Sequence, residues 1–310
     1  MAQYIYGIDI GGTSIKLGLF DASFTLLDKW EIPTNRSDKG RHILPDIVTT
    51  IKTKTPVLSD VIGYGFGVPG PVVKHYIPMC VNLGWADVDL RQELSEVLQN
   101  DNIFAGNDAN VATLGEAFIG AGHGRKNVAM ITLGTGVGSG IIVDGSILEG
   151  AFGSAGEIGH LTIPQDKPIA CNCGKKGCLE TVASATGIMN IYHQELEQFI
   201  GDSTLLNQPS VTAKAIFDAA KNGDVLANIV VDKAAYYIGY ACHVVSITTN
   251  PSVIVIGGGV SKAGDFLIER VTQEFRRLAF PPSRDTKIVL ATLGNDAGIY
   301  GAAELVKRHG

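Results

Sequence analysis

Three cysteines lie within eight residues of one another near the middle of the chain, and a histidine precedes them. The spacing is Cys171-x-Cys173-x₄-Cys178, with His160 eleven residues before the first cysteine. Three thiolates and one imidazole are a ligand set of structural zinc sites, in which four protein ligands leave no open position for catalysis. The glycines between the cysteines allow the tight backbone that such short spacing requires. We therefore predict a structural Zn²⁺ site, in preference to three buried thiols with a redox pair.

Two glycine-rich turns follow apolar runs at corresponding places in the two halves of the chain. The first lies in the segment 9–16 and the second in the segment 134–138, and their residues are Asp9, Gly11, Gly12, Thr13 and Lys16, and Gly134, Thr135, Gly136 and Gly138. Such turns bring backbone N–H groups close to anionic oxygens. A carboxylate beside them is suited to hold the water around Mg²⁺. Each turn alone also fits an ordinary hairpin, but their repetition favours two phosphate-binding turns.

A third glycine run, Gly257-Gly258-Gly259, follows an apolar strand and precedes a helix. It is suited to admit a flat nucleoside against bare backbone, and it is also compatible with a tight strand-to-helix turn. The chain has no G-x-x-x-x-G-K-[ST] motif, and Ser139 breaks a G-x-G-x-x-G pattern in the second turn. These absences disfavour a P-loop enzyme and a dinucleotide dehydrogenase. The remaining possibility is a protein that binds its nucleotide between two domains.

Asn107 and Asp108 stand where a strand gives way to a helix. Both residue types cap helices well, so capping alone accounts for them. The alternative is a functional carboxylate at the carboxyl end of a strand, kept ionised by the helix N-terminus. Such a carboxylate can accept a hydroxyl proton and orient the oxygen for in-line attack on a γ-phosphate.

Two further carboxylates lie near the cysteine cluster. Glu157 precedes His160 by three residues, and Glu180 follows the last cysteine by two. Together with the imidazole and nearby asparagines, they can bind several hydroxyls of a sugar. If zinc takes one nitrogen of His160, the other is free for the ligand and the ring is held in orientation. Each glutamate alone also fits a solvated surface charge.

Alternating and continuous apolar runs predict the elements that must position these residues. In the first half we expect strands and helices at Tyr4–Ile10, Ser14–Phe20, Phe24–Ile32, Gly40–Lys54, Val61–Val68, Leu90–Gln99 and Ile103–Ala105, then a helix to Ile119. In the second half we expect Val128–Leu133, Ile141–Val143, Ser146–Leu148, a long helix Val225–Thr248, Val253–Ile256, Ile288–Leu290 and a last helix from Ala297. The same order, a meander followed by α/β units, occurs twice.

This duplication predicts an α/β fold of two domains that face each other across an interdomain cleft, where ligand sites are common. We expect a smaller N-terminal domain over residues 1–120, joined by the C-terminal helix 296–310. The larger domain then spans residues 121–295 and carries the zinc loop.

Composition narrows the function classes. The 310 residues carry a net charge of −6 at a pI near 5.6, which argues against nucleic acid as a partner. No stretch reaches the roughly 18 to 20 apolar residues of a membrane span, and the N-terminal residues do not have the pattern of a signal peptide. Five cysteines, an odd number, do not suit a disulfide framework. We expect a cytoplasmic protein with no membrane partner, with Cys80 and Cys242 as ordinary, partly buried residues.

These motifs, in this order, resemble those of the ROK family (repressors, open reading frames and kinases). The matching patterns are Asp9-x-Gly11-Gly12-Thr13-x-x-Lys16, Asn107-Asp108, Gly134-Thr135-Gly136-x-Gly138, Glu157-x-Gly159-His160 and Cys171-x-Cys173-Gly174-x-x-Gly177-Cys178-x-Glu180. They cover almost the whole chain. The resemblance implies the duplicated actin-like, ribonuclease H-like fold, and the segment Cys171–Gly187 is most similar to kinases of Gram-positive bacteria that act on glucose.

The resemblance also implies roles for single residues. It makes Asp108 the base that activates the 6-hydroxyl of a hexose, with ATP and Mg²⁺ as cofactors and a homodimer as the assembly. It implies that the sugar is bound by Asn82, Asn107, Asp108, Glu157, His160 and Glu180. The phosphates and the adenosine would lie on Asp9, Gly11, Gly12, Thr13, Lys16, Gly134, Thr135, Gly136 and Gly258, and zinc on His160, Cys171, Cys173 and Cys178.

Three alternatives stay open at this point, two from other classes of protein and one within the kinases. A sugar-sensing repressor would need a DNA-binding domain ahead of the first glycine-rich turn, which starts here at residue 11. An actin-like or chaperone-like ATPase would give the zinc loop and Glu157 no role. A kinase for N-acetylglucosamine, N-acetylmannosamine, fructose or allose differs only in pocket shape, which sequence discriminates poorly.

Overall fold

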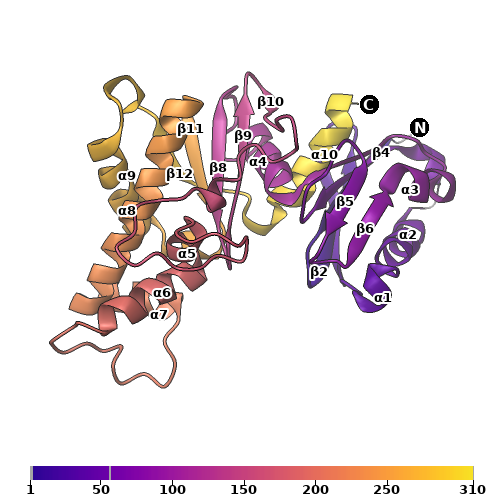
Figure 1. Ribbon diagram of the computed structural model, residues 1–310. Helices are drawn as coiled ribbons and strands as arrows, with labels where there is room; N and C mark the ends of the chain where they lie inside the picture. The colour runs from indigo at the N-terminus through magenta and orange to yellow at the C-terminus, as the bar shows by residue number, and fades with distance from the viewer. Residues whose placement is uncertain (1–2, 56, 310) are drawn as a thin grey trace. The chain divides into compact units, whose positions relative to one another are not determined.

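The computed structural model describes residues 3–55 and 57–309, which divide into two compact units (Figure 1). Of these residues, unit 1 comprises 3–55, 57–124, 149–155 and 295–309, and unit 2 comprises 125–148 and 156–294. The short segment Glu149–Ala155 thus belongs to unit 1, although the chain on both sides of it belongs to unit 2.

Unit 1 is built on a five-stranded sheet with the order β3-β2-β1-β4-β7. Its strands are β1 (Tyr4–Ile10), β2 (Ser14–Asp21), β3 (Leu26–Pro33), β4 (Val61–Val68) and β7 (Ile103–Asn107). A separate hairpin is made by β5 (Tyr76–Cys80) and β6 (Trp85–Asp89). The helices are α1 (Ser37–Gly40), α2 (Ile43–Lys54), α3 (Leu90–Leu98), α4 (Asp108–Phe118) and α10 (Ala297–His309), with a 3₁₀ helix η1 (Leu58–Asp60).

Unit 2 repeats this topology with the order β10-β9-β8-β11-β12. Its strands are β8 (Val128–Leu133), β9 (Val137–Val143), β10 (Ser146–Ile147), β11 (Val253–Gly257) and β12 (Lys287–Leu290). Its helices are α5 (Glu180–Ala183), α6 (Ala185–Leu196), α7 (Ala213–Lys221), α8 (Val225–Thr248) and α9 (Asp265–Leu278), and its 3₁₀ helices are η2 (Ile158–His160), η3 (Gly259–Ala263) and η4 (Pro281–Ser283). Both sheets begin with an antiparallel meander and continue with parallel strands, so the duplicated α/β architecture predicted from the sequence is confirmed.

Each unit buries its own apolar core. In unit 2 the long helix α8 packs beside α9 (Figure 1), and its apolar residues, including Val230 and Ile238, are buried with Phe275 and Ile254. In unit 1 the core gathers around the central strands, with Ile8, Leu17 and Phe66 fully buried. Because almost every residue of β1, β4 and β11 is buried, these strands lack the alternating pattern of a half-exposed strand.

The last helix lies unusually close to the sheet of unit 1. A Cβ added to Gly65 on β4 would lie 1.7 Å from the carbonyl oxygen of Ala302, and one added to Gly7 on β1 would lie 1.9 Å from that of Ile299. Only glycine permits α10 to approach the two strands so closely. On α10 itself, Gly301 packs similarly closely against the backbone of Val111 on α4.

Several element boundaries differ from the sequence prediction by one or two residues, and two differ by more. The helix expected from Gly40 begins only at Ile43, because Asp38, Lys39 and Gly40 have positive φ angles and make a separate turn. The strand expected from Ile141 begins at Val137, since Val137 pairs with Leu133 and leaves only residues 134–136 in the turn. The β5–β6 hairpin was not predicted at all.

Candidate functional site

Asn107 and Asp108 stand at the junction of β7 and α4 in unit 1. The Asn107 side chain caps α4, because its Oδ1 accepts hydrogen bonds from the backbone N–H groups of Ala109 at 3.0 Å and Asn110 at 3.2 Å. Its Nδ2 donates to the carbonyl oxygen of Gly70 at 3.2 Å. Asp108 is the first residue of the helix, and its Oδ1 accepts from the N–H of Ala109 at 2.8 Å. The helix dipole at this position favours a carboxylate over a neutral acid.

Asn82 is exposed on the turn that joins β5 to β6, also in unit 1. The turn is closed by the N–H of Leu83, which donates to the carbonyl of Cys80 at 3.2 Å. The Trp85 indole donates to the carbonyl of Gly40 at 3.1 Å and fixes the far end of the turn. Asn82, Asn107 and Asp108 thus all lie at or just after the ends of strands in one unit.

The β1–β2 turn carries the first group of candidate phosphate-binding residues. The N–H of Gly11 donates to the carbonyl of Ser14 at 2.9 Å, and a Cβ added to Gly12 would meet no atom within 4 Å, so that side of the turn is open. Thr13 is exposed. Lys16 stands opposite Asp9 in the β1–β2 ladder, and its Nζ donates to the carbonyl of Asn295 at 3.3 Å.

Asp9 lies on β1 just before this turn; part of the residue is exposed to solvent, but its carboxyl group is enclosed mostly by protein. Burial raises its pKa above the usual range, while the positive charge of Lys16 acts in the opposite direction. The first turn of α10 packs on it, since a Cβ added to Gly298 would lie 2.5 Å from the Asp9 carboxylate. A buried carboxyl group that burial disfavours as an anion is chemically suited to a cation such as Mg²⁺, which prefers carboxylate and water ligands.

The β8–β9 turn of unit 2 carries the second group. The N–H of Gly134 donates to the carbonyl of Gly136 at 3.0 Å, and the carbonyl of Gly134 accepts from Ala185 at the start of α6 at 2.8 Å. Thr135 between them is exposed. Gly258 after β11 has a φ of +84°, and a Cβ there would lie 2.5 Å from the Leu133 carbonyl oxygen, so no other residue fits this place without rearrangement.

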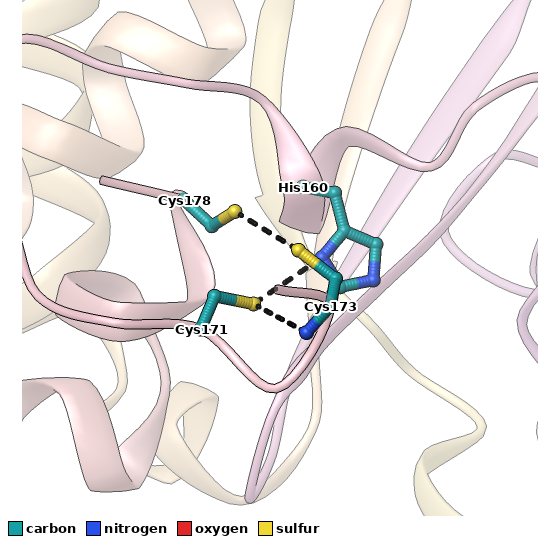
Figure 2. Close-up of side chains that lie close together, drawn as sticks. All are labelled: His160, Cys171, Cys173 and Cys178. Carbon is teal, nitrogen blue, oxygen red and sulfur yellow. Dashed lines mark hydrogen bonds between the residues drawn. The ribbon is translucent and has the colours of Figure 1, made fainter. Parts of the chain in front are cut away.

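The four predicted metal ligands lie together in unit 2, and Figure 2 shows their side chains directed at one another. Their ligand atoms are all within 4.8 Å of each other. Cys173 Sγ lies 3.6 Å from Cys178 Sγ, and Cys171 Sγ lies 3.7 Å from His160 Nδ1. Tetrahedral zinc with Zn–S near 2.3 Å and Zn–N near 2.0 Å requires separations of about 3.5 to 3.8 Å between ligand atoms. The residues present therefore fit a zinc ion.

The thiols of this cluster differ in acidity. Burial, with the hydrogen bond to Glu180, raises the pKa of Cys171 to about 12, and burial raises that of Cys178 as well. The backbone N–H of Lys175, together with the Cys171 thiol, lowers the pKa of Cys173, which is the exposed member. Cys173 is thus the thiol that ionises most readily.

The 156–160 segment is positioned by β9. The hydroxyl of Ser139 donates to the carbonyl of Gly156 and accepts from the N–H of Ile158 at 3.2 Å. Gly159 packs against the backbone of Val137, where a Cβ would lie 2.2 Å from the carbonyl oxygen. Glu157 is exposed at the start of η2.

Glu180 begins α5 immediately after the cysteine loop and is mostly buried, with its side chain 23% exposed. Its Oε1 lies 3.8 Å from His160 Nδ1 and accepts from the Cys171 thiol at 2.9 Å. Because Nδ1 is the nitrogen that faces the thiols, Nε2 is the one left for another partner.

A family model for the ROK family matches residues 5–309. The chain belongs to the ROK family. It is 44% identical to a glucokinase of Halalkalibacterium halodurans over 316 aligned positions, which cover 99% of this chain and 96% of the relative.

Two solved structures of ROK proteins are similar along the whole chain. A ROK family glucokinase of Streptomyces griseus in complex with glucose and AMPPNP has a TM-score of 0.77 at 29% identity, with 98% of this chain and 99% of that chain covered. A ROK hexokinase of Thermus thermophilus has a TM-score of 0.81 at 30% identity, with 98% and 97% covered. Mixed α/β structure and the actin-like fold expected from the resemblance are thereby confirmed.

Two residues of this ROK protein contact the candidate site although the sequence analysis gave them no role. Gly298 admits the Asp9 carboxylate, and the small residues at 297, 298, 301, 302 and 303 were a signal that α10 packs closely. Cys80 hydrogen-bonds the segment after β4, which no spacing in the sequence indicates. Within residues 3–55 and 57–309, none of the helices combines the length and apolar composition that a membrane span requires.

Proposed function

We propose that this protein is an ATP-dependent kinase that transfers the γ-phosphoryl group of ATP to the 6-hydroxyl of glucose. The full-length similarity to the Halalkalibacterium glucokinase carries the choice of glucose. The similarity to a ROK glucokinase that holds glucose and AMPPNP supports both the sugar and the nucleotide.

In this proposal Asp108 is the general base. As the sugar hydroxyl oxygen bonds to the γ-phosphorus, its proton passes to the Asp108 carboxylate, and the bond from that phosphorus to the β–γ bridging oxygen breaks, which releases ADP. Asn107 supports this role, because its Oδ1 accepts from the N–H groups of Ala109 and Asn110 and so caps α4. Asp108 lies at the positive end of the helix, which favours its ionised form. Such a base contributes about 10²- to 10⁴-fold in rate.

The sugar would be held by Asn82 and Asn107 of unit 1 and by Glu157, His160 and Glu180 of unit 2. Each offers a hydrogen-bonding group to a hydroxyl: amide, carboxylate, or the Nε2 of His160. The buried position of Glu180 beside His160 supports a fixed orientation for both. Groups held in this way bind a sugar with little loss of side-chain entropy.

The phosphates of ATP would be bound by residues of the two glycine turns: Asp9, Gly11, Gly12, Thr13 and Lys16 of unit 1, and Gly134, Thr135 and Gly136 of unit 2. Mg²⁺ bound with ATP neutralises phosphate charge, and the buried Asp9 carboxylate would hold its water ligands. Gly258, which is exposed after β11, would border the adenosine.

We further propose that His160, Cys171, Cys173 and Cys178 bind a structural Zn²⁺. The closed set of four protein ligands supports a structural role, since it leaves no position for substrate. The resemblance to ROK kinases also supports a homodimer that is located in the cytoplasm. Its product would enter glycolysis, and we propose no nucleic acid as a partner.

An assay of ADP release with Mg-ATP tests the proposal when glucose, fructose, mannose, N-acetylglucosamine and N-acetylmannosamine are compared side by side. We expect glucose to have the highest kcat/KM by at least about tenfold. Preference for an N-acetyl sugar would show that the assigned substrate is wrong, but it would be consistent with the proposed kinase mechanism. Tight sugar binding without turnover on any of the five would contradict the kinase activity.

A further inference from the structure

The thiol of Cys80 lies buried at the end of β5, with 1% of the residue exposed. Its Sγ donates a hydrogen bond to the carbonyl oxygen of Pro69 at 2.7 Å. Pro69 comes directly after β4, and the next residue, Gly70, accepts the Asn107 side chain at 3.2 Å. The thiol thus hydrogen-bonds the same turn that the Asn107 side chain contacts.

The sulfur also faces the turn that carries Asn82. The backbone N–H groups of Leu83 and Asn82 lie near enough to the thiol to lower its pKa. The N–H of Leu83 also donates to the Cys80 carbonyl at 3.2 Å. A single side chain therefore contacts two turns, and each turn adjoins or contains a proposed sugar ligand.

The thiol keeps its proton at neutral pH, which the hydrogen bond to Pro69 requires. Burial raises the pKa of Cys80, and the negative charge of Asp108 acts in the same direction, more than offsetting the two amides. Close packing leaves the turn little room, since a Cβ added to Gly70 would lie 3.3 Å from the carbonyl oxygen of Met79 and 3.7 Å from Cys80 Cβ.

We propose that Cys80 is a positioning residue for the sugar site, whose S–H bond to Pro69 holds the turn contacted by Asn107 in register with the turn that carries Asn82. The inference rests on the proposed function, because it takes these two asparagines as sugar ligands. Asn107 Oδ1 caps α4 without help from Cys80, so Asp108 keeps its place when the thiol is removed. Loss of the thiol donor should therefore weaken sugar binding and spare the chemical step.

The experiment compares Cys80→Val, which fills similar volume without a donor, with Cys80→Ser, which restores a donor. Cys242→Ala is the matched control, since Cys242 is a fully buried cysteine on α8 in the core of unit 2. For each protein we would measure KM for glucose, kcat, the melting temperature, and the dissociation constant of glucose by calorimetry without nucleotide. Calorimetry separates sugar binding from turnover.

We expect Cys80→Val to raise both KM and the dissociation constant of glucose by about five- to tenfold, the value of one hydrogen bond, with kcat within about twofold. Cys80→Ser should stay within about twofold of the wild type, and Cys242→Ala should lower the melting temperature without a change in KM. If Cys80→Val does not fold, Cys80→Ala against Cys80→Ser makes the same comparison.

Wild-type glucose affinity in Cys80→Val would overturn the inference, and so would an equal loss in the serine and valine variants, which would mean that packing alone matters. In both cases wild-type turnover on glucose would leave the proposed function intact. Failure of the wild-type protein to bind or phosphorylate any sugar would instead contradict the proposed function, and the inference with it.

Discussion

The Glu180 carboxylate accepts a hydrogen bond from the thiol of Cys171, with 2.9 Å between Oε1 and Sγ. Its other oxygen faces the β8–β9 turn, where a Cβ added to Gly136 would lie 2.8 Å from Oε2. One side chain therefore connects the cysteine cluster to the turn proposed to hold phosphate. A metal ion that orders the cluster would also order Glu180 and His160, so metal binding and sugar binding should be coupled.

Removal of one zinc ligand tests this coupling. Cys173→Ser should lower the zinc content, measured by plasma emission, from about one ion per chain to near zero. The dissociation constant of glucose should rise by at least about tenfold, the lower end of the range for groups that support a site. Cys242→Ala, a cysteine on α8 outside the cluster, serves as the control and should keep its zinc. Wild-type glucose affinity in a zinc-free protein would contradict the coupling.

The buried Asp9 should cost stability in the protein without nucleotide. Its pKa is raised on folding, so the folded state holds this proton more tightly than the unfolded chain. Its contribution to stability therefore falls as the pH rises from the unfolded value of about 3.9. Asp9→Asn should raise the melting temperature at pH 7, and this gain should vanish below about pH 3.9. Its kcat/KM with Mg-ATP should fall by more than about a hundredfold, since metal coordination is worth several kcal/mol.

Asp21→Asn, a substitution in the same unit, should change the melting temperature at pH 7 in the opposite direction. Hydrogen bonds from Ser23 and Thr25 lower the pKa of this exposed carboxyl group, so it stabilises the fold above its unfolded pKa and loses that effect in acid. The asparagine variant should melt below the wild type at pH 7. An Asp9→Asn protein that also melts lower at pH 7 would show that burial does not strain this carboxyl group.

The close packing of α10 on β4 should leave no room for a side chain at Gly65. Gly65→Ala places a methyl group 1.7 Å from the carbonyl oxygen of Ala302, which belongs to a helix backbone and cannot rotate away. We expect a loss of about 3 kcal/mol or more in the free energy of unfolding, measured with urea. Gly259→Ala is the control, since a Cβ there meets nothing within 4 Å. Equal stability of the two variants would be inconsistent with the close packing.

Sequence patterns predicted the elements best where burial is continuous. The strand Tyr4–Ile10 and the helix Val225–Thr248 match the prediction residue for residue, because long apolar runs with clear ends leave few alternatives. The β5–β6 hairpin was missed, since its strands are short, Pro78 interrupts the first, and Gly84 and Asp87 have positive φ. Asn82 was therefore identified as a sugar ligand from the family resemblance alone, and the hairpin turn on which it lies was not predicted.

In the candidate site too, some features could be predicted from the sequence and others could not. The close spacing of the three cysteines restricts their geometry strongly, and the structure brings them together with His160. Capping was one of two interpretations of Asn107 and Asp108, and the observed hydrogen bonds confirm that Asn107 caps α4. The role of Asp108 as a base stays a prediction. The contact of Gly298 with Asp9 joins segments distant in sequence, so the small residues of α10 could indicate close packing but not this partner. The contact of Cys80 with Pro69 depends on the β5–β6 hairpin, which was not predicted.

The most direct test of the central claim is the turnover of Asp108→Asn on glucose, with glucose affinity measured on the same protein. Asparagine keeps the shape of the side chain and cannot accept the hydroxyl proton as a carboxylate does. We expect kcat to fall by about 10²- to 10⁴-fold while the dissociation constant of glucose stays within a few-fold of the wild type. Turnover near the wild-type value would contradict the assignment of Asp108 as the base of an ATP-dependent glucose kinase.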